Sequence, residues 1–188
     1  MPNWCNNDLT VTGKKADIDK MLEAIKGTGD GSKVIPFDFE KVLPTPKELL
    51  DEPAPAEKNK AKANEIQYGA KDWYDWRVNN WGCKWGIGED TQINIKRGTC
   101  GMGFETAWAP PTGIIKKLSE MFPNLKFKLA YVEPGMVFAG VFTAKAGEIV
   151  DDFADGSNPR AYRAIMSEYF PDTLASIEEY EEEMKGQE

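Results

Sequence analysis

The chain has 188 residues, enough for one domain with a sizeable core, and its 41% hydrophobic and 29% charged residues are typical of a globular protein. It contains no histidine, which excludes histidine general bases, Ser-His triads and every zinc site that uses histidine. No apolar run approaches the ~20 residues that span a bilayer, and the N-terminus lacks the pattern of a signal peptide. We therefore expect a cytoplasmic protein with no membrane partner.

The net charge of −8 is concentrated at the C-terminus. Residues 166–188 contain eight acidic residues and one lysine, which leaves 23 acidic and 22 basic residues for positions 1–165. The body is therefore nearly neutral, and neither part has the basic stripe that binds phosphate backbones. This distribution argues against direct nucleic-acid binding, although the acidic tail leaves open a mimic of nucleic acid.

Apolar periodicity predicts the elements of the first half in chain order. Alternating residues predict a first strand over residues 7–13, and apolar residues three and four apart predict a helix over residues 15–26. Residues 34–39 are predicted as a second strand, at an edge because Pro36 cannot donate a backbone hydrogen bond. The prolines and small polar residues of residues 44–70 predict an insertion on the surface.

The second half alternates more regularly. Residues 92–96 and 102–108 predict a hairpin, and an apolar stripe predicts a helix over residues 112–122. Residues 125–132 and 137–144 predict a second hairpin. Its connection, residues 133–136, fits a type II turn with proline at the second position and glycine at the third.

The C-terminal remainder is predicted to be helical. Residues 151–156 resemble a calcium loop only superficially, because the third and twelfth positions lack oxygen ligands, and we expect them to lead into a helix. Asn158 is a suitable N-cap for that helix, with proline in its first position. Pro171 precedes a last, acidic helix.

This order of elements predicts an α+β domain of ferredoxin-like type over residues 1–147. We expect a split β-α-β sandwich with an antiparallel sheet, helices on one face and the surface insertion at residues 44–70. Residues 148–188 would form an acidic, helical C-terminal extension. The name describes topology alone, because the sequence has no iron–sulfur ligand pattern.

Four separated sequence blocks resemble the signatures of one family, the YubB ferredoxin-like proteins, which are carried by phages and plasmids. The resemblance extends over residues 1–144, and the blocks are Met1-Pro2-Asn3-Trp4-Cys5-x-Asn7, Asn80-Trp81-Gly82-Cys83-Lys84-Trp85, Phe104-x-Thr106-Ala107-Trp108-x-Pro110-Pro111 and Tyr131-x-Glu133-Pro134-Gly135. It implies a ferredoxin-like fold and an origin on a mobile element. It implies no established activity.

The three cysteines, Cys5, Cys83 and Cys100, form no CxxC pair and are irregularly spaced. Since cytosolic thiols are usually reduced, we expect three free thiols, no bound metal and no cofactor.

Asparagines and tryptophans of the signature blocks form the candidate binding site, together with one lysine. The candidate ligand- or partner-binding residues are Asn3, Trp4, Asn6, Trp81, Lys84, Trp85 and Trp108. We expect them at one end or edge of the sheet, where Asn3, Trp4, Trp81 and Lys84 would line a pocket for a planar or polar ligand or a peptide. A structural alternative is that the asparagines hold turns and the tryptophans anchor the core.

The favoured function is a non-enzymatic binding module of a phage or other mobile element, whose partner is a host protein or a small ligand. No residue is assigned a catalytic role. The alternative from the enzyme class is a small enzyme that uses the amine of an N-terminal Pro2, or a carboxylate such as Glu105 or Glu133.

Overall fold

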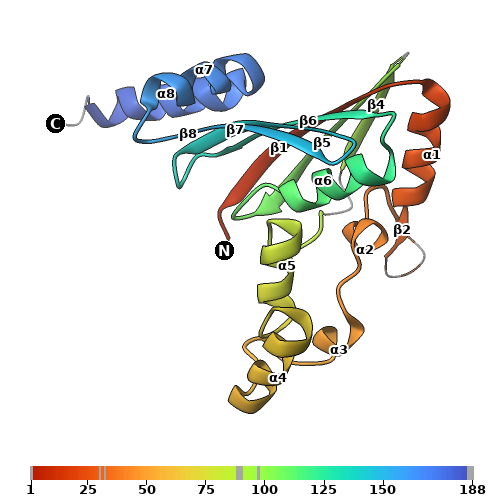
Figure 1. The fold of residues 1–188 in the computed structure, drawn as a ribbon. Helices are drawn as coiled ribbons and strands as arrows, with labels where there is room; N and C mark the ends of the chain where they lie inside the picture. The colour runs from red at the N-terminus through yellow and green to blue at the C-terminus, as the bar shows by residue number, and fades with distance from the viewer. Residues whose placement is uncertain (1, 30, 32, 88–90, 97, 186–188) are drawn as a thin grey trace.

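A six-stranded antiparallel sheet in the order β4-β5-β1-β6-β7-β8 forms the centre of the computed structural model (Figure 1), which describes residues 2–29, 31, 33–87, 91–96 and 98–185. Apart from the segment between α1 and β4, the first elements follow in the order β1-α1-β4-β5-α6-β6, which is the ferredoxin-like split β-α-β order and confirms the predicted fold class. These elements are β1 (Trp4–Thr12), α1 (Lys15–Ile25), β4 (Gln92–Lys96), β5 (Thr99–Ala107), α6 (Thr112–Met121) and β6 (Lys126–Glu133).

Two further strands, β7 (Phe138–Lys145) and β8 (Glu148–Asp155), extend the sheet beyond β6. The expectation that residues 151–156 lead into a helix is therefore wrong, because most of them belong to the edge strand β8. Asp151 and Asp152 are poor strand formers and hid the strand in the sequence. The phenol of Tyr131 reaches across Gly140 in β7 and donates a hydrogen bond of 2.9 Å to Asp151, which helps to hold β8 in register.

The predicted second strand over residues 34–39 is also wrong. Only β3 (Val34–Ile35) is extended, and it pairs with β2 (Gly27–Thr28) in a separate two-stranded sheet. The chain then turns into the short helix α2 (Phe39–Val42), because the Asp38 carboxylate accepts a hydrogen bond from the Glu40 N–H and caps it. The second strand of the ferredoxin-like motif is β4, so everything between α1 and β4 interrupts that motif.

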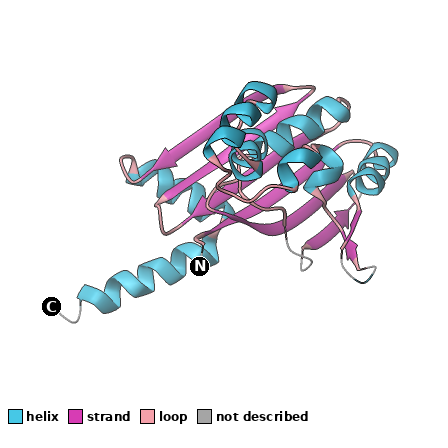
Figure 2. Cartoon of the chain, turned by 90° about the horizontal axis from the view of Figure 1, so that it is seen from below, coloured by secondary structure: helices cyan, strands magenta, loops and turns pink. Residues whose placement is uncertain are grey.

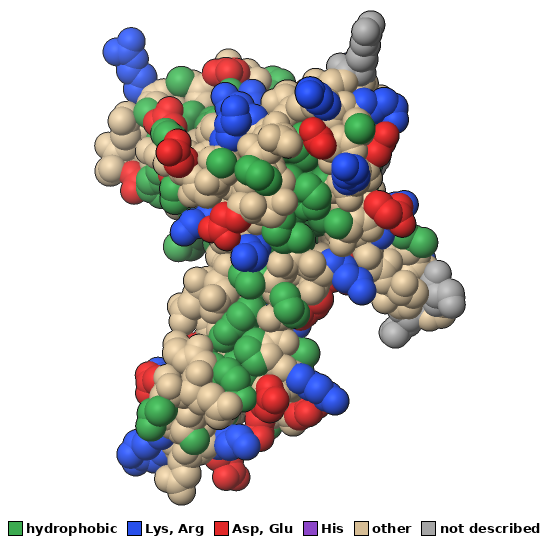
Figure 3. Space-filling model, turned by 45° about the vertical axis from the view of Figure 1, so that its right-hand side comes forward, with side chains coloured by type: hydrophobic (Ala, Val, Ile, Leu, Met, Phe, Trp, Pro, Cys, Tyr) green, Lys and Arg blue, Asp and Glu red, His purple; other side chains and the backbone are tan. Residues whose placement is uncertain are grey.

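This interrupting segment projects from the helix-covered face of the sheet (Figure 1). It contains α2 and three more helices, α3 (Lys47–Leu50), α4 (Lys58–Tyr68) and α5 (Trp73–Trp81), and Figure 3 shows hydrophobic side chains along it with charged side chains nearer its tip. A polar network joins α2 to α5: the Arg77 guanidinium contacts Glu40 Oε1 at 2.7 Å and Thr45 Oγ1 at 3.1 Å. Arg77 also stacks on the Trp81 ring, 4.5 Å from its centroid.

The two faces of the sheet bury different cores. The larger core lies between the sheet and the helices α1 and α6, the helical layer expected from the sequence. On the opposite face, α7 (Pro159–Tyr169) covers β7 and β8 and buries Tyr162, Ile165 and Met166 against a smaller cluster that includes Val132. The C-terminal segment thus adds a third layer to the two-layer sandwich.

The last helix, α8 (Pro171–Lys185), buries no residue completely. It packs on α7 and then extends past the body of the molecule (Figure 2). Within the part of the chain that the structure describes, no helix has both the length and the apolar character needed to cross a membrane.

We predict that Gly113→Ala lowers the free energy of unfolding by about 2 kcal/mol in urea denaturation, because a Cβ at Gly113 would overlap the Asn80 carbonyl. The loss should exceed the helix-propensity gain of about 1 kcal/mol that alanine brings at the start of α6. Gly103→Ala in β5 is the matched control, since nothing lies within 4 Å of its Cβ position. Equal stability of the two variants would contradict the close contact between α5 and α6.

Candidate functional site

The signature blocks meet at one end of the sheet. Trp4 lies opposite Ala107 in the β1–β5 register, and the Trp108 N–H donates a hydrogen bond of 3.0 Å to the Asn3 carbonyl. The Asn3 side chain lies against Gly135, where a Cβ would come within 2.7 Å of its Nδ2 atom. Segments from three blocks therefore touch, as the sequence analysis expected for the N-terminal segment and Trp108.

A buried polar network fixes this junction. Asn7 Nδ2 donates to the Cys5 carbonyl at 2.8 Å and to Thr106 Oγ1 at 2.9 Å, and Thr106 Oγ1 in turn donates to the Ala109 carbonyl at 2.8 Å. Because these groups are buried, each hydrogen bond lost would leave an unpaired polar atom in the core. The asparagine and threonine of these blocks thus have a structural role.

Glu133 is also engaged structurally. Its buried carboxylate accepts hydrogen bonds from the Gly135 N–H at 2.9 Å and the Met136 N–H at 2.6 Å, so both oxygens hold the β6–β7 connection. The predicted type II turn is wrong: the positive φ, +55°, falls on Val137, and Gly135 does not adopt one. A Cβ at position 135 would lie 2.7 Å from Asn3 Nδ2, so a larger residue there would displace the end of the Asn3 side chain.

Asn6 and Glu105 lie opposite each other on β1 and β5. They share the face turned away from the larger core, because their neighbours Cys5 and Asn7 alternate to the inside. Glu105 is exposed and Asn6 is half-buried.

The structure divides the predicted site residues into separate groups. Trp4 and Trp108, 44% and 46% exposed, lie at the sheet end with Asn3. Trp81 is only 1% exposed: it lies in the larger core, and its Nε1–H donates a hydrogen bond of 2.7 Å to the Leu43 carbonyl. Since Trp4 points to the other face of the sheet, Trp4 and Trp81 do not line one pocket. The role of these residues in binding stays a prediction.

Lys84 and Trp85 lie next to each other just after α5, in the segment between α1 and β4, and Lys84 lines a cavity. The ammonium group of Lys84 lies 4.4 Å from the centroid of the Trp85 ring and 5.3 Å from that of Tyr74. Gly82, at φ +93°, ends α5 and turns the chain toward these positions. The cavity measures about 440 Å³ and is lined by Ala54, Pro55, Lys71, Asp72, Trp73, Tyr74, Asp75 and Lys84.

The charged side chains that line this cavity differ in whether they have partners. Asp72 caps α5, since its Oδ1 accepts from the Asp75 N–H at 3.0 Å and its Oδ2 accepts from the Ala56 N–H at 3.4 Å. In contrast, neither Lys71 nor Lys84 forms an ion pair with any residue that the structure describes. The cavity thus holds two lysines and the carboxylate of Asp75 beside flat apolar walls, and its ammonium groups suit an organic anion.

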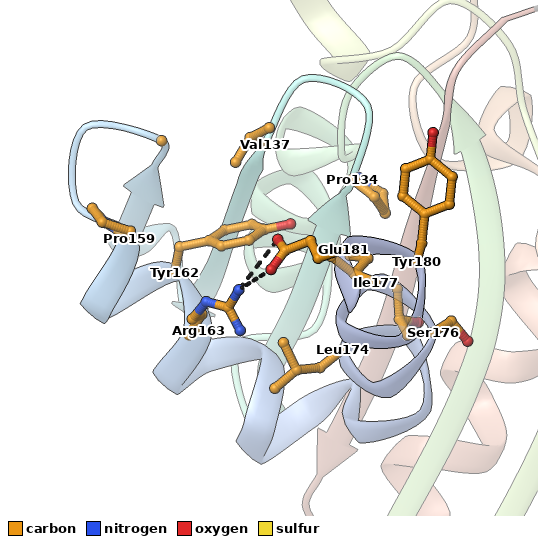
Figure 4. A pocket seen from close by; sticks show the side chains of 12 residues that line it. Pro134, Val137, Pro159, Tyr162, Arg163, Leu174, Ser176, Ile177, Tyr180 and Glu181 are labelled. Carbon is orange, nitrogen blue, oxygen red and sulfur yellow. Dashed lines mark hydrogen bonds and ion pairs between the residues drawn. The ribbon is translucent and has the colours of Figure 1, made fainter. Parts of the chain in front are cut away.

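A second cavity, of about 470 Å³, lies between the β6–β7 connection and the helices α7 and α8 (Figure 4). Pro134, Val137, Leu174 and Ile177 supply apolar walls, and the ion pair of Arg163 with Glu181 lies at its side. The sequence analysis missed this cavity. The available signal was the pair Leu174 and Ile177, three residues apart in an otherwise acidic helix.

All three cysteines are free and buried. Burial, together with the nearby Glu133 carboxylate, raises the pKa of Cys5 far above its usual range, and burial raises the pKa of Cys83 to about 12. These thiols are neutral and inaccessible near pH 7, so they are poor nucleophiles. Within the described ranges, no three acidic or thiol side chains are grouped closely enough to hold a metal ion.

Fold and cavities together define a ferredoxin-like α+β domain with an insertion after its first helix. Residues 80–184, more than half of the chain, match the family model described as the ferredoxin-like domain in Api92-like protein, and the chain belongs to this family. The match extends through β8, α7 and most of α8, beyond the resemblance seen in the sequence. The YubB name and an origin on a phage or plasmid stay predictions.

The structure is similar to the crystal structure of protein api92 from Yersinia pseudotuberculosis. The two share 12% sequence identity with a TM-score of 0.51 over 82% of this chain and 98% of that chain, so the similarity shows the fold alone. No curated protein matches the sequence significantly.

Cys83 should make stability depend on alkaline pH. A thiol whose pKa rises from 9.0 to about 12 on folding keeps its proton in the folded state while the unfolded chain loses it. The contribution of this thiol to the free energy of unfolding is therefore complete below pH 9. Above pH 9 the contribution decreases by about 1.4 kcal/mol per pH unit. Between pH 9 and 11, the free energy of unfolding in urea should fall less steeply for Cys83→Ala than for the wild type. Parallel curves of this free energy against pH would contradict burial of the neutral thiol.

Proposed function

We propose that the protein is a non-enzymatic binding module and that the Lys84 cavity is its ligand site. The Lys84 ammonium group carries this proposal, because it stacks on Trp85 beside an open cavity and forms no ion pair within the described part of the chain. Of the candidate catalytic groups, Glu133 holds a turn with both oxygens, and the three thiols are buried.

The chemistry of the cavity favours a carboxylate or phosphate attached to a flat apolar group. Trp73 and Tyr74 meet edge to face, 6.2 Å between centroids, and with Pro55 give the cavity rigid apolar walls. Lys84 is positioned by two rings, so it loses little freedom when an anion arrives. The resemblance to phage- and plasmid-borne proteins supports a host protein as one source of such a group.

Isothermal titration of phenylacetate and phenyl phosphate, with phenethylamine as the cation of similar shape, tests the proposal. We expect both anions to bind more tightly than the amine. Lys84→Gln should weaken anion binding about tenfold, since a charged hydrogen bond contributes about 1.5 kcal/mol or more. Lys20→Gln, an exposed lysine on α1, removes the same charge outside the cavity and should have no effect.

Trp85→Ala separates positioning from charge. It keeps the Lys84 ammonium group but removes the ring beneath it, and we expect weaker binding with an unchanged preference for anions. The proposal fails if neither anion binds, if the amine binds equally well, or if Lys20→Gln weakens binding as much as Lys84→Gln.

A further inference from the structure

Helix α8 is attached to the body along one side. Leu174 and Ile177 pack on the smaller core, and the Arg163 guanidinium of α7 contacts Glu178 at 2.6 Å and Glu181 at 2.9 Å. The remainder of the helix extends away from the sheet (Figure 2). The inner side of α8 therefore has partners, whereas its outer side faces solvent.

The solvent-facing part of α8 combines apolar and acidic side chains. Tyr180 and Met184 are 63% and 49% exposed, and their spacing of four residues places them on one side. Glu179, Glu182 and Glu183 form no ion pair with any described residue. Their spacing puts these three carboxylates on one face of the helix.

The apolar cavity of about 470 Å³ adjoins this helix. Tyr180 lines it near Pro134, so the exposed apolar side of α8 is continuous with the cavity (Figure 4). The opposite wall includes Val137, a β-branched residue at φ +55°. Such a conformation costs about 1–3 kcal/mol, and strained residues of this kind are concentrated at binding sites.

We propose that α8 and this cavity bind a basic amphipathic segment of a partner protein. An apolar side chain of the segment would occupy the cavity beside Tyr180, and its lysine or arginine residues would pair with Glu179, Glu182 and Glu183. Charge complementarity selects this occupant. Two copies joined through α8 would set the same carboxylates against each other, and nucleic acid would be repelled. The surface and the charge of the ligand both differ from those of the Lys84 cavity, so this inference goes beyond the proposed function.

Fluorescence anisotropy with a labelled helical peptide of leucine and lysine tests the inference. The reference probe is the same peptide with every lysine replaced by glutamate. We expect the wild type to bind the lysine peptide alone. The triple variant Glu179→Lys, Glu182→Lys, Glu183→Lys should weaken binding at least tenfold and reduce its salt dependence. Tyr180→Ala with Met184→Ala should also weaken binding but leave the salt dependence unchanged.

The matched control reverses three exposed acidic residues on the insertion, Asp51→Lys, Glu57→Lys and Glu65→Lys, which changes the net charge equally. This control should bind the peptide like the wild type. The α8 variants should retain the wild-type melting temperature because α8 buries no residue completely, and the control should retain it because its three residues are exposed. Equal weakening by the control would reduce the effect to net charge and overturn the inference. It is overturned too if the glutamate peptide binds, if the apolar variant binds normally, or if sedimentation shows a wild-type dimer that the α8 triple variant disperses.

Discussion

The contact between two backbone segments, residues 80–82 and 110–113, determines how the insertion sits on the sheet. A Cβ at Gly113 would overlap the Asn80 carbonyl, and a Cβ at Gly82 would lie 2.6 Å from the Pro110 carbonyl oxygen. This close approach packs α5 against the start of α6. Trp81 is buried there and donates a hydrogen bond to the Leu43 carbonyl. The orientation of Lys84 follows, because the chain leaves α5 through Gly82. The Lys84 cavity therefore depends on two missing side chains as much as on the residues that line it.

Strongly periodic segments could be predicted from the sequence, and so could the edge strand β4, whereas the edge strand β8 and the course of residues 34–39 could not. The strands β1 and β5 alternate between buried and more exposed residues over most of their length, so their pattern is visible without a structure. β8 has a free edge and mostly exposed residues, and its aspartates mask the pattern. Residues 34–39 have the composition of a strand, but a cap from Asp38 turns the chain into α2.

The sequence predicted which segments come together at the candidate site, but not which of their side chains are exposed. Blocks far apart in the sequence do meet at one sheet end, where Asn3 contacts both Trp108 and Gly135. Sequence alone cannot separate an exposed tryptophan from a buried one, because burial depends on tertiary packing: Trp81 donates a hydrogen bond to the distant Leu43 carbonyl, whereas the Trp85 ring contacts its sequence neighbour Lys84. The cavity beside α8 requires the packing of α7 on the far face, which no local pattern specifies.

The central position of β1 has a consequence for how the chain folds. Trp4 pairs with Ala107, and Asn6 pairs with Val132. Both edges of β1 can therefore form their backbone hydrogen bonds only after β5 and β6 have been synthesised. The Arg77–Glu40 network of the insertion joins residues that are closer in sequence. Because contacts between distant residues form late, the inserted segment is expected to acquire structure on the ribosome before the sheet that it interrupts. An element that divides the fold in sequence would then serve as the early surface on which α6 and the remaining strands assemble.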